Sequence, residues 1–268
     1  MTLSALDGEI RDLLRFAAER AILPRYRNLA EGEVEEKAKD DVVTIADKET
    51  ELFLTEALTR LAPDVAVVGE EAVHADATVL ERLNGPCWII DPLDGTHNFA
   101  SGKPPFGILV ALADGGETVA GWIYDVLTGR FCHAAKGKGA FIDGQRVYAR
   151  ETGETLPVAA ISLLFMDPDQ RKKVQVHIAP HYRMVDIPRC AAEQYPRLVL
   201  GENDLSIFER TLSWDHAAGV LFLNEAGGKA ARYDGSDYRV DHPTVRGLIG
   251  ASSPKLWDEM AKQLNTMD

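Results

Sequence analysis

Two aspartates stand three residues apart, directly after a short apolar run. Residues 87–90 are wholly apolar and predict a strand buried on both faces, and Asp91 follows them without a polar spacer. Pro92 removes a backbone donor, so we expect the strand to stop here and the chain to turn through Asp94. The carboxylates of Asp91 and Asp94 can then converge on one point, where the carbonyl of Leu93 can join them.

Two carboxylates this close repel each other unless a cation lies between them. Hard divalent cations such as Mg²⁺ prefer such oxygen ligands. Gly95 permits close approach of the backbone, and Thr96 is a candidate cap for a helix starting near His97, whose free N–H groups would face an anion. A cation beside an anion site predicts phosphate chemistry. The alternative is an ordinary acidic turn closed by Asx hydrogen bonds.

Three more acids stand at the ends of expected elements. Residues 65–68 predict a second strand, and Glu70 follows it, either in a surface turn or close to Asp91 as in a binuclear oxygen site. Asp47 begins a helical segment, where it either caps the helix or accepts a proton from a hydroxyl near the metal. Asp215 stands at the start of a later helix, and the local sequence alone predicts that it is the N-cap of that helix.

The composition excludes several classes of protein. The net charge of −13 over 268 residues, with no basic stripe, argues against a nucleic-acid partner. Three widely spaced cysteines argue against a disulfide framework or a zinc site. No apolar run approaches the ~18 residues of a membrane span, and the first residues lack the basic and apolar regions of a secretory signal. We therefore expect a cytoplasmic protein with neither a nucleic-acid nor a membrane partner.

The periodicity of apolar residues predicts a mixed α/β protein. Residues 3–23 have helical spacing, and residues 106–113, 118–126 and 129–135 predict an antiparallel meander. In the second half, expected strands alternate with expected helices, which favours α/β layers. These strands are residues 158–165, 182–187 and 246–251, and the helices are residues 169–178, 191–200, 216–226 and 254–264. We place a boundary near residues 150–156, where Glu, Thr, Gly and Pro interrupt the pattern.

Two basic stretches have simple structural interpretations. Residues 136–141 are rich in glycine but lack the spacing of a P-loop, so we expect a turn, and Asp143-Gly144 predicts a hairpin turn. Lys37 and Lys39 either face solvent or lean over a nearby anion.

Four separated segments together resemble the inositol monophosphatase family of Mg²⁺-dependent, lithium-sensitive phosphatases. They are residues 41–47, residues 69–71, residues 88–99, and Trp214-Asp215 together with residues 225–228, and residues 137–141 are similar as well. One such segment is weak evidence, but four in the same order along nearly the whole chain are specific. The resemblance implies a layered αβαβα sandwich of the inositol monophosphatase and fructose-1,6-bisphosphatase type, and a homodimer. It also implies an N-terminal α+β half (1–150) that contains most metal ligands and a C-terminal α/β half (151–268) that contains Asp215 and the substrate-selecting residues.

The resemblance also implies a set of metal ligands. Glu70, Asp91 and the Leu93 carbonyl would hold the first Mg²⁺, and Asp91, Asp94 and Asp215 the second. A third, weaker ion would use Glu70 and water. Mn²⁺ is an expected substitute, whereas Li⁺ and Ca²⁺ are expected inhibitors.

By the same resemblance, Asp94 and the backbone of Gly95 and Thr96 would bind the phosphate. Asp47 would pair with the Thr96 hydroxyl, and these two residues with Glu70 would be catalytic, activating water for in-line attack on the phosphate.

The residues expected to contact the substrate depart from the family pattern. Inositol-cleaving relatives have a Gly-Ser/Thr-Ala-Ala stretch and a downstream Glu, which here correspond to residues 189–192, read Arg-Cys-Ala-Ala, and to Glu209. Glu209 stands one residue closer to Trp214 than usual, and the segment 161–190 is short. We expect Ala191 and Glu209 to contact the substrate, and Arg189 either to recognise a second anionic group or to be a surface charge.

The predicted function is Mg²⁺-dependent hydrolysis of a small-molecule phosphate ester, as in an inositol-1-monophosphatase. Alternative substrates on the same scaffold are a 3′(2′),5′-bisphosphate nucleotide, fructose 1,6-bisphosphate, histidinol phosphate and NADP. A non-catalytic metal-binding or regulatory protein is a further alternative. The complete set of acids argues against it, because a binding module needs no pair of residues to activate water.

Overall fold

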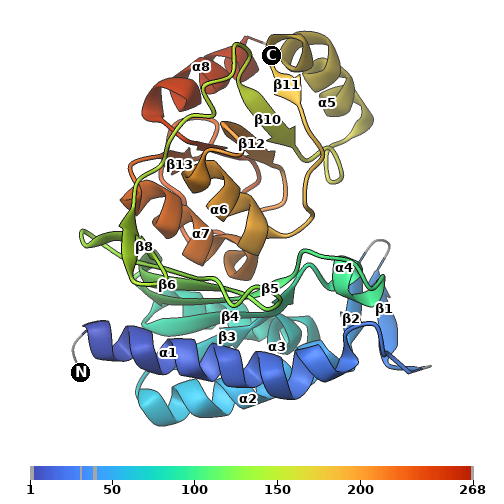
Figure 1. Ribbon diagram of the computed structural model, residues 1–268, viewed down its shortest axis with the longest axis vertical. Helices are drawn as coiled ribbons and strands as arrows, with labels where there is room; N and C mark the ends of the chain where they lie inside the picture. The colour runs from blue at the N-terminus through green and yellow to red at the C-terminus, as the bar shows by residue number, and fades with distance from the viewer. Residues whose placement is uncertain (1–2, 31, 39–40, 267–268) are drawn as a thin grey trace.

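A computed structural model describes residues 3–30, 32–38 and 41–266 of the protein. For residues 3, 4, 36–38 and 41 it describes the backbone alone. The described residues form five layers (Figure 1). Helices α1 (Leu3–Ala17) and α2 (Ile45–Leu61) cover the outer face of a seven-stranded sheet. Helices α6 (Ala191–Leu200) and α7 (Ser213–Glu225) lie between this sheet and a five-stranded sheet. The outermost layer contains α5 (Pro168–Lys173) and α8 (Pro254–Asn265), so the predicted αβαβα sandwich is confirmed.

The seven-stranded sheet contains the predicted meander. Its strands lie in chain order. Strand β3 is parallel to β4, and all the remaining neighbouring pairs are antiparallel. The strands are β3 (Ala66–Gly69), β4 (Cys87–Asp94), β5 (Gly107–Asp114), β6 (Glu117–Asp125), β7 (Phe131–Ala135), β8 (Gly139–Ile142) and β9 (Gln145–Val147). Residues 136–138 form a turn between β7 and β8, and Asp143-Gly144, both with positive φ, form the predicted hairpin turn.

Strand β4 is buried along its whole length, as its composition predicts. Trp88 and Ile90 face the core under α1 and α2, while Cys87 and Ile89 face the core under α6 and α7. An apolar side chain is therefore needed at each of these four positions, which explains the absence of polar alternation among them. The prediction that the strand stops at Pro92 is wrong. The ladder to β5 continues to Asp94 because an irregularity in register between Asp91 and Asp94 accommodates the residue without an N–H.

The five-stranded sheet has the order β11-β10-β12-β14-β13, with β10 parallel to both of its neighbours. Its strands are β10 (Val158–Ile161), β11 (Arg183–Met184), β12 (Leu205–Phe208), β13 (Lys229–Ala231) and β14 (Leu248–Ala251). Three of these were predicted, with longer bounds. The central strand β12 was missed because its four residues are too few for a periodic pattern and a serine, buried here, interrupts them.

The remaining elements are short. A two-stranded hairpin contains β1 (Val34–Ala38) and β2 (Asp41–Thr44), and the helices are α3 (Glu70–Ala75) and α4 (Thr96–Ala100). The first predicted helix, over residues 3–23, is α-helical to Ala17 and continues as the π-helical turn Ala18–Ile22 and the 3₁₀ turn Leu23–Arg25. Further turns are the 3₁₀ segments Ala77–Asn84 and Ala179–His181 and the π-helical segment Val174–Ile178.

The chain passes from the first sheet to the second between residues 147 and 158. Helix α7, from the second half of the chain, packs on β6 of the first half, so the core is shared across this crossing. The division into the halves 1–150 and 151–268 stays a prediction. Among the described residues, no helix combines the length and apolar character that crossing a membrane requires.

Gly121 of β6 allows the close contact with α7. A Cβ atom at Gly121 would lie 2.8 Å from the Cα of Ala218, whereas one at Gly8 of α1 would meet nothing within 4 Å. We therefore expect Gly121→Ala to lower the free energy of unfolding by about 1–3 kcal/mol, measured by urea titration. Gly8→Ala, the matched control, should leave it unchanged or raise it by up to about 1 kcal/mol. Equal stability of the two variants would contradict this packing.

Candidate active site

One pocket of about 180 Å³ is lined by residues that follow strands of both sheets. Its walls come from the carboxyl ends of β3, β4, β10 and β12 and from the beginnings of α6 and α7. Nearly all the predicted site residues line it: Glu70, Asp91, Leu93, Asp94, Gly95, Thr96, Arg189, Ala191, Glu209 and Asp215. Segments more than a hundred residues apart in sequence therefore form one site.

Asp47 contacts this pocket through Thr96. Its Oδ2 accepts hydrogen bonds from the backbone N (2.8 Å) and hydroxyl (2.6 Å) of Thr44, the N-cap of α2. Its Oδ1 lies 3.0 Å from the Thr96 hydroxyl, which also lies 2.8 Å from the carbonyl oxygen of Leu93. The capping alternative for Asp47 is therefore confirmed, because one oxygen closes a capping box. The other oxygen accepts from a hydroxyl at the pocket, and the catalytic alternative stays a prediction.

The capping predictions for Thr96 and Asp215 are wrong. Helix α4 begins at Thr96, and its N-cap is Gly95, whose φ of 85° suits glycine. A side chain at Gly95 would also meet the carbonyl oxygen of Pro105 at 2.9 Å. Helix α7 has Leu212 as its N-cap, which places Asp215 in the first turn. Neither the Thr96 hydroxyl nor the Asp215 carboxylate is therefore used as an N-cap.

Burial and like charge dominate the electrostatics of the pocket. Asp91 is 2% exposed, and its pKa is raised well above the usual range, first by burial and then by the charges of Glu70, Asp94 and Asp215. The pKa of Asp94 is raised to about 7, mainly by burial. Ionised carboxylates packed in this way are costly unless positive charge accompanies them.

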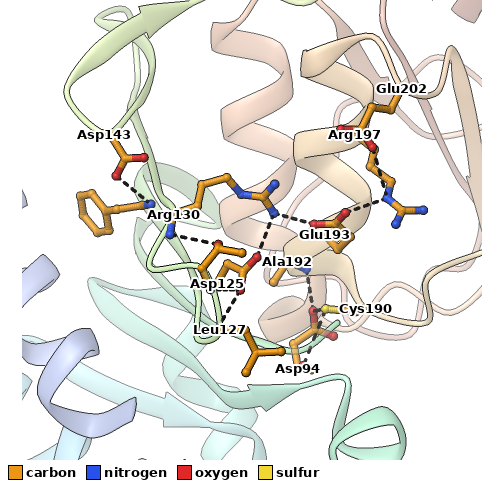
Figure 2. A network of polar contacts seen from close by, with 12 residues as sticks. Asp94, Asp125, Leu127, Arg130, Asp143, Cys190, Ala192, Glu193, Arg197 and Glu202 are labelled. Atoms are coloured by element: carbon orange, nitrogen blue, oxygen red, sulfur yellow. Dashed lines mark hydrogen bonds and ion pairs between the residues drawn. The ribbon is translucent and has the colours of Figure 1, made fainter. Parts of the chain in front are cut away.

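One oxygen of Asp94 is fixed by the start of α6 (Figure 2). Asp94 Oδ2 accepts from the backbone N of Ala192 at 2.6 Å and from the Cys190 thiol at 3.1 Å. The next residue, Glu193, lies 2.5 Å from Arg130 of the β6–β7 connection and 2.8 Å from Arg197. The seven-stranded sheet and α6 thus hold Asp94 from two sides, which orients its carboxylate at the pocket.

Glu51 positions the segment that contains Glu70. It lies one helical turn after Asp47 and accepts hydrogen bonds from the backbone N of Glu71 and of Ala72, both at 2.8 Å. These are the first N–H groups of α3, which need such partners. The sequence analysis missed Glu51, although its spacing from Asp47 places both on one face of α2.

Two more pocket residues were not recognised in the sequence. Arg210 lies with its Nη2 atom 3.9 Å from Asp215 Oδ2, and its guanidinium stacks 4.2 Å above the ring of Phe165. Gln194 is buried, and its Nε2 donates to Ser206 at 2.7 Å, while its Oε1 has no hydrogen-bond partner in the described structure. The position of Arg210 directly after Glu209 was the only available signal.

The expected substrate residues differ in their surroundings. Arg189 is exposed at the pocket and has a φ of 54°. Ala191 begins α6, whereas Glu209 is buried, with its two oxygens 3.4 Å from Gln170 Nε2 and 3.3 Å from the Tyr233 hydroxyl. Lys39 and the side chain of Lys37 lie outside the described residues.

The donor set has the chemistry of a site for hard divalent cations. Four carboxylates and the Leu93 carbonyl line one pocket, and the buried Asp91 and Asp94 supply the anionic oxygens that such ions prefer. Among the described residues, no three His, Cys, Asp or Glu side chains form a closed set of metal ligands. The acids instead line one wall of the pocket.

The fold and the pocket define a class of protein. An αβαβα sandwich with buried carboxylates beside a carboxylate–hydroxyl pair is the architecture of a metal-dependent phosphatase. The chain belongs to the inositol monophosphatase family, whose model matches residues 9–267, and it is thereby a phosphomonoester hydrolase. This confirms the predicted family and enzyme class.

Individual relatives match most of the chain. It is 32% identical to an inositol-1-monophosphatase of Bacillus subtilis over 238 residues, which cover 87% of each chain. It is 29% identical to a fructose-1,6-bisphosphatase/inositol-1-monophosphatase of Aquifex aeolicus over 228 residues, covering 82% of this chain and 83% of that protein. The solved structure of a Thermotoga maritima IMPase superposes with a TM-score of 0.82 at 25% identity, covering 99% and 98% of the two chains.

Burial raises the pKa of Asp47 to about 7 from 3.8. The folded chain therefore binds more protons than the unfolded chain between these pH values, and the stability contributed by Asp47 falls as the pH rises through them. The predicted quantity is the free energy of unfolding of Asp47→Asn minus that of wild type, both in metal-free protein. We expect this difference to be about 2 kcal/mol more positive at pH 8 than at pH 5. Urea titrations measure it.

The exposed Asp64 provides the matched control. The free energy of unfolding of Asp64→Asn should change with pH as that of wild type does. Burial lowers the pKa of His216 to about 3, so His216 makes stability rise with pH, opposite to Asp47. Because wild type and both variants contain His216, its effect cancels when they are compared. Parallel pH profiles for wild type and Asp47→Asn would show that Asp47 ionises normally.

Proposed function

We propose that this protein hydrolyses a small-molecule phosphomonoester with Mg²⁺ as cofactor, in the manner of an inositol-1-monophosphatase. The observation that carries the proposal is the Thr96 hydroxyl, which lies between Asp47 Oδ1 and the Leu93 carbonyl at the edge of an acidic pocket. A metal-binding module has no need of a hydroxyl held by a buried carboxylate. Family membership supports the same activity.

The residues that would hold the ions are those already named by resemblance. Glu70, Asp91 and the Leu93 carbonyl would hold one Mg²⁺, Asp91, Asp94 and Asp215 a second, and Glu70 with water a third. When bound, Mg²⁺ favours ionisation of the attacking water and offsets the charge of the phosphate and the leaving group. Mn²⁺ is the expected substitute, and Li⁺ and Ca²⁺ are the expected inhibitors.

The protein residues around the ions would move one proton and orient one phosphate. Asp47, when ionised, accepts a hydrogen bond from the Thr96 hydroxyl, which leaves the Thr96 oxygen able to accept a hydrogen bond from water. As the water is deprotonated, its proton would pass to Thr96 while the Thr96 hydroxyl proton passes to Asp47. The backbone N–H groups of Gly95 and Thr96 would bind phosphate oxygens, because the positive φ of Gly95 lets the chain turn closely there. Asp94 would help to orient the phosphate, since one of its oxygens is already fixed by Ala192.

The proposal includes predictions about oligomeric state, location, partners and substrate. We expect a homodimer that works in the cytoplasm on a small-molecule ester, with no nucleic-acid or membrane partner. Inositol 1-phosphate is the first substrate to test. The name of the Aquifex aeolicus relative adds fructose 1,6-bisphosphate, and the alternatives of the sequence analysis complete the panel: 3′-phosphoadenosine 5′-phosphate, histidinol phosphate and NADP.

Asp91→Asn and Asp215→Asn should each abolish Mg²⁺-dependent phosphate release. We expect a loss of at least about 100-fold in kcat/KM on the best ester of the panel, because even outer partners of metal ligands contribute 10–100-fold. Phosphate release is measured with Mg²⁺ and with chelator, and circular dichroism checks the fold. Asp64→Asn, an exposed acid, should keep wild-type turnover. Near-normal turnover of Asp91→Asn at saturating Mg²⁺ would refute the assignment.

A further inference from the structure

The pocket contains two arginines that the hydrolysis proposed above does not use. Arg189 lies in the segment before α6, and Arg210 follows β12, yet both line the same cavity as the acids. If bound cations neutralise the acids, these two guanidinium groups remain as positive charge facing the substrate. A single transferable phosphate is already served by the ions and by the Gly95–Thr96 backbone, so the arginines need another explanation.

Arg210 is preorganised as a planar donor. Its guanidinium stacks 4.2 Å above the Phe165 ring, which fixes the plane of the group. Its Nη2 atom lies 3.9 Å from Asp215 Oδ2, an ion-pair distance that is longer than a hydrogen bond. Once Asp215 ligates a cation, that carboxylate attracts Arg210 less, and an anion of the substrate becomes the stronger partner.

Arg189 keeps a strained backbone at the rim of the pocket. Its φ of 54° is favourable for glycine but strained for a residue with a side chain. The segment is clamped to the phosphate loop, because Asn98 Nδ2 donates to the carbonyl oxygens of both Pro188 and Pro105 at 2.9 Å. Strain kept at a residue beside a site indicates a use for its side chain.

Few hydrogen-bond acceptors in the pocket are available for the hydroxyl groups of a polyol, and some already have donors within the protein. Each carboxylate oxygen of Glu209 lies within 3.4 Å of a protein donor, Gln170 Nε2 or the Tyr233 hydroxyl, and the side chain is buried. Binding of sugar hydroxyls by Glu209 would therefore compete with contacts inside the protein. Gln194 Oε1, buried and without a hydrogen-bond partner in the described structure, offers one acceptor for an O–H or N–H of the substrate.

We propose that the site selects a phosphomonoester that carries a second anionic group of phosphate size, which Arg189 and Arg210 bind. The inference rests on the proposed function and names its substrate class. Planar guanidinium forks match phosphate oxygens in pairs, and such charge-assisted hydrogen bonds are about twice as strong as neutral ones. A sugar bisphosphate and a nucleoside bisphosphate both supply this chemistry.

Two matched pairs of substrates test the proposal and distinguish these sources. Fructose 1,6-bisphosphate is compared with fructose 1-phosphate, and adenosine 3′,5′-bisphosphate with adenosine 3′-phosphate, by phosphate release at saturating Mg²⁺. We expect wild type to prefer the bisphosphate of one pair by at least about tenfold in kcat/KM, as one charge-assisted contact provides. The pair that shows the preference identifies the source.

Variants then assign the preference to the arginines. Arg210→Gln and Arg189→Gln should each reduce it by about three- to tenfold, mainly through KM for the bisphosphate. Arg210→Lys should restore part of it, because the charge is kept and the fork is lost. The ratio within a pair cancels any effect on metal binding. Arg60→Gln on the outer helix α2, where the side chain is 68% exposed, is the matched control and should keep the full preference.

The outcomes separate the two proposals. Phosphate release without preference for either bisphosphate would overturn this inference and leave the proposed function intact. A preference that survives in both glutamine variants would also overturn it. Absence of Mg²⁺-dependent release from all four esters and from inositol 1-phosphate would overturn the proposed function, and this inference with it.

Discussion

The rest of the site depends on the burial of like-charged carboxylates at the end of one strand. The first four residues of β4 are apolar on both faces, so Asp91, the next residue of the strand, lies in a region from which water is excluded. There burial and the neighbouring acids oppose its ionisation. In the function proposed above, a divalent cation would offset this charge, and the same cation would attract a phosphate ester.

The surrounding elements hold these acids against their repulsion. Asp94 is bound by the first N–H groups of α6, and the Arg130–Glu193 ion pair ties α6 to the β6–β7 connection (Figure 2). Glu51 does the same for the start of α3 beside Glu70. Because these supports come from the seven-stranded sheet and from helices packed on its two faces, we expect a packing change at a contact between that sheet and a helix to affect the site as well.

The sequence predicted the chemical groups that line the pocket better than the residues that support them. The acids and the Thr96 hydroxyl follow from apolar runs that end in acids and from a resemblance over nearly the whole chain, and the layered fold follows from that resemblance. Strand β12 is four residues long and has no period to detect. Arg210 and Glu51 act through contacts with segments distant in sequence, Phe165 and α3, which only tertiary structure brings together. Such contacts leave no pattern in the sequence, which explains why Arg210 and Glu51 were missed.

The central claim, that the buried acids exist to hold Mg²⁺, is tested most directly by thermal unfolding of chelator-treated protein at pH 8 as MgCl₂ is added. Ligands that bind only the folded state raise the melting temperature in proportion to the logarithm of their concentration above Kd. The account predicts a rise of several degrees, about 1–2 kcal/mol, beyond that in NaCl of equal ionic strength, and its absence in Asp91→Asn. A rise matched by NaCl, or equal in Asp91→Asn, would contradict it.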